Sequence, residues 1–411
     1  MKKKVILALI LVVIFNFVNN KEKELNVLET KELNNNTLSM MLETSAGTGE
    51  YQEATASSWP TEGYTFNENL SKCENGSSLS WDNTKKKVVM EGNSSDKCYV
   101  YFDVVPPKLA DYVKSLYTIQ GANNLYLHDS SLENGANDGS YRYAGSSETT
   151  NNFVCFGYDS MDGTCPTDNL YRIIGVFDNQ VKLIKYDYAN SNLLGTDGDY
   201  STATYSKSSS NTYKGELTTI NSYYWNYKSN TSLNGGLGSG IWSSSLLNKT
   251  NLNTNYLNNI GKKWNELISM HTWKVYGGSV SFEDTVAIAY KNEITLPAKN
   301  WTYDAKVGLI YISDYGYAAL PSAWTTQLKY YNNQIVTNAN WMYMGLIEWT
   351  ILQASYSDTN NYYVYYISSD GSIPPSYFPN SNYAIRPVFY LNSDISYAGG
   401  LGTKSSPFII N

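Results

Sequence analysis

Short apolar runs alternate with polar turns along most of the chain. In the first quarter, these runs recur at residues 38–42, 63–66, 78–81, 87–90 and 98–102. Segments rich in Asn, Asp and Gly separate them, as at residues 74–76, 82–84 and 91–93. Short strands at close spacing with turn signals between them predict a small all-β domain, a sandwich, which we place at residues 37–104.

A different pattern begins at residues 105–107, which read Val-Pro-Pro and mark a domain boundary. Helical spacing then places apolar side chains on one face, at Leu109, Tyr112, Val113, Leu116 and Tyr117. Gly121 is suited to end such a helix. We therefore predict a linker with one amphipathic helix over residues 105–122.

The remaining residues, 123–411, are expected to form one larger α+β domain. A hairpin is predicted from the apolar runs at 170–176 and 181–186 around the polar turn 177–180. Helices are predicted at 243–252 and 256–270, and later strands at 307–312, 362–367 and 384–391. Because helices and strands do not alternate regularly, a doubly wound parallel sheet is not expected.

The N-terminus has the pattern of an export signal. Three lysines at positions 2–4 precede an unbroken apolar run at residues 5–15. No small-residue cleavage site follows, so residues 1–20 are either a signal peptide or a membrane anchor. Residues 21–36 are charged and rich in Asn and form a predicted stalk. We expect the rest of the chain to be extracellular, either at the cell surface with a membrane anchor or secreted.

The amino-acid composition excludes several classes of protein. The chain has 411 residues, a net charge of -7 and only 16% charged residues. An acidic chain lacks the basic footprint that nucleic acids require, so no nucleic-acid partner is expected. Two histidines and four cysteines exclude zinc fingers, iron–sulfur clusters and most histidine-based catalysis. The 38 tyrosines and 10 tryptophans favour a β-rich binding protein.

The four cysteines permit three disulfide connectivities. We predict the local pairing, Cys73 with Cys98 and Cys155 with Cys165, because each pair falls within one predicted domain. Such disulfides persist in oxidising compartments, which agrees with export.

Two segments resemble a known family. Residues 344–350 (MGLIEWT) resemble a conserved block of formylglycine-generating-enzyme-like domains, which share their fold with C-type lectins. Residues 384–388 (AIRPV) resemble the strand that closes those domains. Residues 171–176 (YRIIGV) and 241–248 (IWSSSLLN) are similar to lectin-like domains of exported Firmicutes surface proteins. The resemblance implies a C-type-lectin-like fold, also called sulfatase-modifying-factor-like, from about residue 170 to the end.

The resemblance also implies structural roles for three residues and argues against oxidase chemistry. Glu348, Trp349 and Arg386 belong to the structural motif, and Arg386 is expected to tie the closing strand to the core by a charged hydrogen bond. The oxidases of this family need a late cysteine pair, and no cysteine follows Cys165. Leu346 stands where the family has an Asn associated with calcium. We therefore expect no cofactor and no metal site. Calcium stays an open alternative because residues 159–163 and 197–199 form acidic, Gly-bearing loops.

Aromatic residues near turns in the second half suggest a binding face. Tyrosine offers large contact area at low entropy cost and a hydroxyl group for hydrogen bonds. The candidate ligand-binding residues are Trp341, Tyr343, Tyr356, Tyr363, Tyr366 and Asp370. The prediction is an adhesion or binding protein, not an enzyme, that recognises an extracellular glycan or protein. Two alternatives stay open: a carbohydrate-active hydrolase that pairs Glu348 with Asp370 or Asp314, and a purely structural envelope protein.

Overall fold

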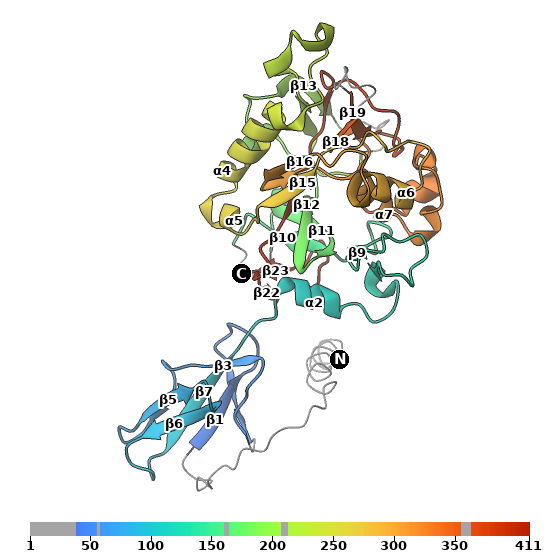
Figure 1. The fold of residues 1–411 in the computed structure, drawn as a ribbon. Helices are drawn as coiled ribbons and strands as arrows, with labels where there is room; N and C mark the ends of the chain where they lie inside the picture. The colour runs from blue at the N-terminus through green and yellow to red at the C-terminus, as the bar shows by residue number, and fades with distance from the viewer. Residues whose placement is uncertain (1–37, 56–57, 160–163, 207–212, 355–362) are drawn as a thin grey trace. The chain divides into compact units, whose positions relative to one another are not determined.

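The computed structural model describes residues 38–55, 58–159, 164–206, 213–354 and 363–411. The chain divides into two compact units, Met1–Val105 and Pro106–Asn411 (Figure 1). The predicted signal or anchor at 1–20 and the stalk at 21–36 lie outside the described residues. Within the described ranges, every helix is too short or too polar to cross a membrane.

The first unit is built from strands. Its strands are β1 (Leu38–Glu43), β2 (Tyr51–Ala54), β3 (Tyr64–Phe66), β4 (Lys72–Cys73), β5 (Ser78–Asp82), β6 (Lys87–Glu91) and β7 (Cys98–Val104). One sheet has the order β2-β1-β7-β3, with β4 also paired to β7, while β5 and β6 form a separate hairpin. Leu79 and Trp81 of this hairpin pack against a core of Met40, Val100 and Phe102. Between residues 38 and 104, the described part of this unit thus consists of strands joined by turns.

The second unit contains a seven-stranded sheet and several small ones. The large sheet contains β8 (Leu125–Leu127), β9 (Tyr141–Tyr143), β10 (Phe153–Cys155), β11 (Leu170–Phe177), β12 (Gln180–Lys185), β17 (Val307–Gly308) and β21 (Val388–Tyr390). Its order is β17-β21-β12-β11-β9-β8, with β10 also paired to β11, and all of these pairings are antiparallel. Smaller sheets use β13 (Tyr200–Ser206), β14 (Thr219–Tyr224), β15 (His271–Lys274), β16 (Thr302–Ala305), β18 (Glu348–Ala354), β19 (Tyr363–Ile367), β20 (Asn382–Tyr383), β22 (Tyr397–Gly399) and β23 (Ile409–Ile410).

The β11–β12 hairpin is the centre of this unit. Its turn residues, Asp178 and Asn179, both have positive φ (45° and 65°), which is the conformation of the two-residue hairpin turn that Asp and Asn tolerate. Almost every residue of both strands is buried. The sheet is therefore covered on both faces, and the hairpin predicted from the sequence occupies its middle.

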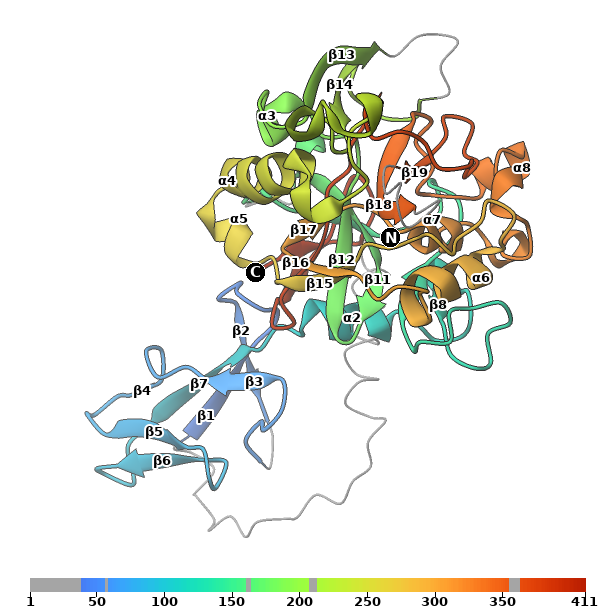
Figure 2. The same ribbon diagram turned by 45° about the horizontal axis from the view of Figure 1, so that its top comes forward.

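Short helices cover the sheet. They are α2 (Leu109–Ser115), α3 (Ser191–Leu194), α4 (Leu257–Asn259), α5 (Lys262–Glu266), α6 (Val286–Tyr290), α7 (Ile312–Tyr317) and α8 (Gln334–Asn338). A wide π-helical segment, Leu247–Tyr256, leads into α4. In both views, α4 and α5 lie on one side of the central hairpin and α6 and α7 on the other (Figures 1 and 2). The chain is thus a mixed α/β protein with mostly strands and few helices.

Four sequence predictions need correction here. The helix expected in a linker at 105–122 is α2, which packs into the core of the second unit through Leu109 and Val113. The helix expected at 256–270 is broken at Gly261, whose φ of 87° a helix does not allow. The strand expected at 307–312 ends at Gly308, because the chain turns into α7. The long strand at 384–391 is paired in the large sheet only over β21.

Candidate functional site

The β18–β19 hairpin carries part of an aromatic surface of the second unit. Its register pairs Trp349 with Tyr366 and Glu348 with Ile367. Side chains that pair across antiparallel strands share a face, and the rings of Trp349 and Tyr366 lie 6.2 Å apart between centroids. Trp349 is buried and Tyr366 is partly exposed. The hairpin thus places one ring in the core and the next at the surface.

Five partly exposed rings form a continuous row at this surface, which we call the aromatic strip. Its members are Phe378, Tyr363, Tyr377, Tyr366 and Tyr383. Phe378 lies 5.0 Å from Tyr363 and 5.3 Å from Tyr377, measured between ring centroids. Tyr377 lies 6.2 Å from Tyr366, which lies 5.2 Å from Tyr383. These spacings are those of packed aromatic pairs, so the rings support one another.

Backbone hydrogen bonds hold the strip in place. The amide of Val364 donates to the carbonyl of Tyr377 (2.9 Å), and the amide of Tyr377 donates back to Val364 (2.8 Å). Tyr383 lies in β20, which pairs with β14. Beneath the strip, the indole N–H of Trp349 donates to the carbonyl of Tyr223 (2.9 Å). A surface held in this way loses little conformational entropy when a ligand binds.

Two of the predicted binding residues lie in the core instead. Trp341 is 1% exposed, and its indole N–H donates to the carbonyl of Tyr143 (2.8 Å). The guanidinium of Arg172 stacks on the Trp341 ring at 4.7 Å. Tyr343 is 5% exposed and donates to the carbonyl of Ser369 (2.7 Å). Neither residue faces solvent, so the sequence-based assignment of both to a binding face is corrected. Both rings fill the interior and satisfy backbone carbonyls.

The other predicted binding residues differ in position. Tyr363 and Tyr366 belong to the aromatic strip. Asp370 lies exposed in the turn after β19, where its carboxylate accepts hydrogen bonds from the amide and hydroxyl of Ser372 (3.0 and 2.7 Å). Tyr356 lies outside the described residues. Tyr377, Phe378 and Tyr383 were not among the predicted residues. Tyr383 in particular gives no periodic signal, because it is a single Tyr in a two-residue strand.

Glu348 and Arg386 join the two segments that carry the family resemblance. The guanidinium donates twice to the carboxylate, at 2.7 and 2.5 Å, and once to the carbonyl of Met342 at 2.7 Å. Each side chain is only 2% exposed. Burial alone would lower the pKa of Arg386, but the charge and hydrogen bonds of Glu348, together with the neighbouring Tyr188 and Asp187, outweigh this effect and raise the pKa. This pair ties the closing segment to β18, which is the role expected for Arg386.

The three carboxylates of the hydrolase hypothesis each have separate partners. Glu348 is bound by Arg386, as described, and Asp314 by Lys182 at 2.5 Å. Asp370 is bound by Ser372. A glycosidase needs two carboxyl groups that flank one substrate. Because Glu348 and Asp314 are buried and neutralised by cations, their environments do not match that requirement.

The acidic loop at 197–199 is held by the protein itself. Asp199 is fully buried, and its two carboxylate oxygens accept four backbone N–H groups at 2.8–3.1 Å, from Tyr227, Lys228, Leu246 and Leu247. Asp197 accepts from the side chain of Asn255 (2.6 Å). Burial raises the pKa of Asp199, and the four backbone hydrogen bonds to its carboxylate oppose this shift. The loop therefore has a structural explanation that does not involve calcium. Of the loop at 159–163, only Asp159 is described, and it forms an ion pair with Lys263.

The cysteines form the local pairs predicted from the sequence, Cys73–Cys98 and Cys155–Cys165. Asp96 lies close to the first pair. Its carboxylate accepts the backbone amides of Asn75 (2.8 Å) and Ser77 (3.0 Å). Because both sulfur atoms are consumed in a disulfide, this group is not suited to hold a metal ion.

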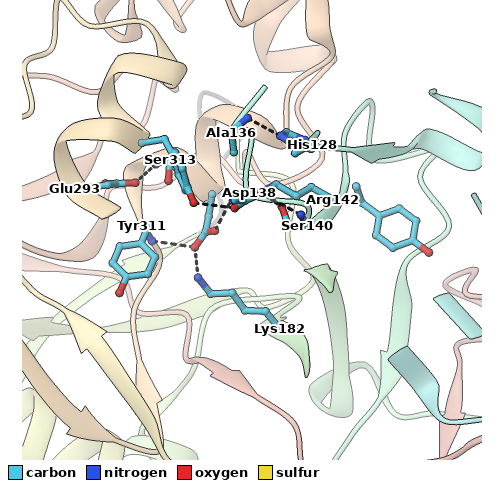
Figure 3. A network of polar contacts seen from close by, with 12 residues as sticks. His128, Ala136, Asp138, Ser140, Arg142, Lys182, Glu293, Tyr311 and Ser313 are labelled. Carbon is cyan, nitrogen blue, oxygen red and sulfur yellow. Dashed lines mark hydrogen bonds and ion pairs between the residues drawn. The ribbon is translucent and has the colours of Figure 1, made fainter. Parts of the chain in front are cut away.

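A second polar cluster lies inside the second unit (Figure 3). Arg142 donates to Ser140 (2.8 Å) and Asp138 (2.6 Å), and Asp138 also accepts from the hydroxyl of Tyr290 (2.8 Å). Lys182 donates to Asp314. Although burial raises the pKa of Asp138, the charge of Arg142 and the hydrogen bonds from Ser140 and Tyr290 together outweigh it and lower that pKa well below its usual range. This cluster contains two cations and two anions and is electrically balanced.

Two further titratable groups flank this charge cluster. Glu293 is buried, and its Oε1 accepts the backbone amide of Ser313 (2.8 Å), while its Oε2 has no hydrogen-bond partner among the described residues. Burial raises the pKa of Glu293 to about 8. His128 accepts the amide of Ala136 (3.0 Å) through Nδ1, and burial lowers its pKa. The sequence analysis missed this cluster, although a lysine inside the apolar run VKLIK at 181–185 is a usable signal of a buried charge.

The comparisons with known proteins leave the chain without an assigned family. No family model, no curated protein and no solved structure matches it. The functional argument therefore depends on the chain's own residues and on the geometry described above.

Proposed function

We propose that this protein is an exported surface protein whose second unit binds an extracellular glycan through the aromatic strip. The observation that carries the proposal is the continuous row of five partly exposed rings on ordered backbone. A pyranose ring packs its apolar C–H face on an aromatic ring, while its hydroxyls bond to polar atoms at the rim. Tyrosine serves both contacts, because it has an apolar face and a phenolic hydroxyl.

The side chains of the strip suit a neutral ligand. Its five members carry no formal charge, and no charged group is needed to stack a sugar. Contiguous exposed aromatic side chains are also typical of binding sites, since a protein surface otherwise leaves large apolar side chains scattered. A row of several rings matches an oligosaccharide better than a single small molecule, because consecutive sugars stack on consecutive rings.

Export and the lectin-like fold are parts of the same proposal. The basic and apolar N-terminal pattern and the two disulfides support an extracellular location. The lectin-like fold is supported by the contact between the two resembling segments. There, Glu348 pairs with Arg386, and the amide of Ala384 donates to the carbonyl of Ile347 (3.0 Å).

Binding to a glycan array tests the proposal. The full-length protein is applied to immobilised oligosaccharides and mucins, and Tyr377→Ala and Tyr366→Ala are compared with wild type. Removing one central ring is expected to weaken binding about tenfold or more, since truncating a central aromatic contact costs about 2 kcal/mol. Tyr330→Ala is the matched control, because Tyr330 is 55% exposed and lies outside the strip.

Two outcomes would contradict the proposal. One is saturable glycan binding that Tyr377→Ala and Tyr330→Ala leave equally unchanged, which would place the site elsewhere. The other is the absence of glycan binding together with strip-dependent binding to a protein ligand, which would replace the ligand class. Chelator-sensitive binding would add a calcium requirement to the site.

A further inference from the structure

The buried ion pair between Lys182 and Asp314 brings an amine and a carboxyl group together in the core. Lys182 belongs to β12 and Asp314 to α7, and they are 132 positions apart in the sequence. The Nζ–Oδ2 distance is 2.5 Å, and the side chains are 1% and 2% exposed. The contact therefore joins the central sheet to a helix that covers it.

Aromatic rings surround the amine. The Lys182 Nζ atom lies 4.4 Å from the ring centroid of Tyr311, 5.2 Å from Tyr390, and 5.6 Å from both Phe177 and Trp273. Such a shell separates the pair from bulk water. Exclusion of water favours condensation, and fixed proximity replaces the high concentration that two free reactants would need.

The carboxyl group of Asp314 is also oriented. Its Oδ2 accepts the backbone amide of Tyr311 (3.2 Å), and its Oδ1 lies 3.7 Å from the guanidinium of Arg142. Arg142 is itself fixed by Asp138 and Ser140. A fixed cation and a backbone N–H beside a carboxyl carbon stabilise negative charge that develops on its oxygens during nucleophilic attack.

From this geometry we infer that Lys182 and Asp314 condense into an intramolecular amide bond that links β12 to α7. A proton first passes from the ammonium group of Lys182 to the carboxylate of Asp314, which frees the nitrogen lone pair. That lone pair attacks Cγ of Asp314, the new N–C bond forms, and one C–O bond breaks with its electron pair leaving on oxygen. Of the three ammonium hydrogens, two leave with that oxygen as water and one stays on the amide nitrogen. The ion pair and the product differ by one water molecule, so no oxidant, reductant or activating group is required.

Two neighbouring groups support the reaction. Burial lowers the pKa of Lys182, which increases the fraction of neutral amine. We assign Glu293 the proton relay, because its Oε1 accepts the amide of Ser313, the residue before Asp314, and its Oε2 has no partner in the described part of the chain. With a pKa near 8, Glu293 holds its proton at neutral pH.

Charge balance is preserved by the reaction. Before condensation the cluster holds Arg142 and Lys182 against Asp138 and Asp314. Amide formation removes one charge of each sign and leaves the Arg142–Asp138 pair intact. Since buried ions carry a large desolvation cost, replacing one pair by a neutral amide removes that cost without stranding a charge.

Mass spectrometry of the full-length protein tests the inference. After reduction of the disulfides, the intact mass of wild type is expected to be one water below the sequence mass. A protease digest is expected to contain one branched peptide that joins the segments around Lys182 and Asp314. The Lys329–Glu283 pair, 2.8 Å apart but solvent-exposed, is the internal control and should stay unlinked. Lys182→Met, Asp314→Ala and Glu293→Gln should each restore the full mass and abolish the branched peptide.

The wild-type digest keeps the inference falsifiable even if a variant fails to fold. Unlinked peptides for both Lys182 and Asp314 in folded wild-type protein, with no loss of water, would overturn it. A water loss that maps to any other pair of residues would overturn it as well. If Glu293→Gln retains the bond in full yield, the proton relay assigned to Glu293 is wrong, while the linkage itself stands on the wild-type result.

Discussion

Replacing Glu348 by alanine is expected to destabilise the second unit strongly. The Arg386 guanidinium makes three hydrogen bonds, two of them to Glu348, and both side chains are almost fully buried. Glu348→Ala removes two of these bonds and leaves a buried cation whose remaining hydrogen-bond partner, among the described residues, is the carbonyl of Met342. Stranding one member of a buried ion pair costs about 3–5 kcal/mol. That is a large fraction of the roughly 5–15 kcal/mol that stabilises a typical domain.

Urea unfolding measures this loss. Tryptophan fluorescence reports on the second unit through buried residues such as Trp349, and a lower midpoint with an unchanged slope indicates lost stability. Glu348→Gln keeps one oxygen acceptor and the side-chain volume, so a smaller loss of about 2 kcal/mol is expected. Glu283→Ala is the control, because its partner Lys329 forms an exposed pair that contributes about 0–1 kcal/mol.

A small effect of Glu348→Ala, equal to that of Glu283→Ala, would refute the reasoning. It would mean that Arg386 finds another partner or water. A double variant with Arg386→Leu separates the two contributions. If the pair is coupled as described, the free energy of unfolding of the double variant should fall by much less than the sum of the two single-variant decreases, because no charge is then left unpaired.

Two further predictions concern pH and a disulfide. Burial lowers the pKa of His271 to about 4 from its usual 6.5, so its neutral form stabilises the fold above pH 6.5, and this stabilisation is lost as pH falls through about 4. Between pH 6.5 and about 4, the free energy of unfolding of wild type should therefore fall by up to about 1.4 kcal/mol per pH unit more than that of His271→Gln, as measured by urea unfolding at several pH values. A parallel pH dependence of the two proteins would disprove this role of His271. Removal of the Cys155–Cys165 link, which spans 10 positions, by a double Cys→Ser change should cost about 3 kcal/mol, and an unchanged urea midpoint would show that the closed loop contributes nothing.

Some of the fold could be predicted from local pattern alone. The β11–β12 hairpin follows from two apolar runs around an Asp-Asn turn, and the strands of the first unit follow from turn signals at close spacing. The failures have physical causes. The apolar stripe at 256–270 is periodic, but Gly261 admits a left-handed conformation that ends the helix there. The short apolar run at 307–312 is compatible with either a buried strand or a buried helix. Only tertiary packing decides that α7 begins at Ile312.

The candidate site was harder to predict because tyrosine has two roles in this chain. Tyr315 and Tyr365 are buried, and their hydroxyls donate to the carbonyls of Gly371 (2.8 Å) and Val280 (2.6 Å). A buried loop must satisfy its backbone carbonyls, and a tyrosine does so while filling core volume. The same residue type forms the aromatic strip, where its ring is partly exposed. Aromatic content near turns therefore does not distinguish core tyrosines from surface tyrosines. Only the folded strand does so, because Tyr365 of β19 is buried while its neighbour Tyr366 is partly exposed.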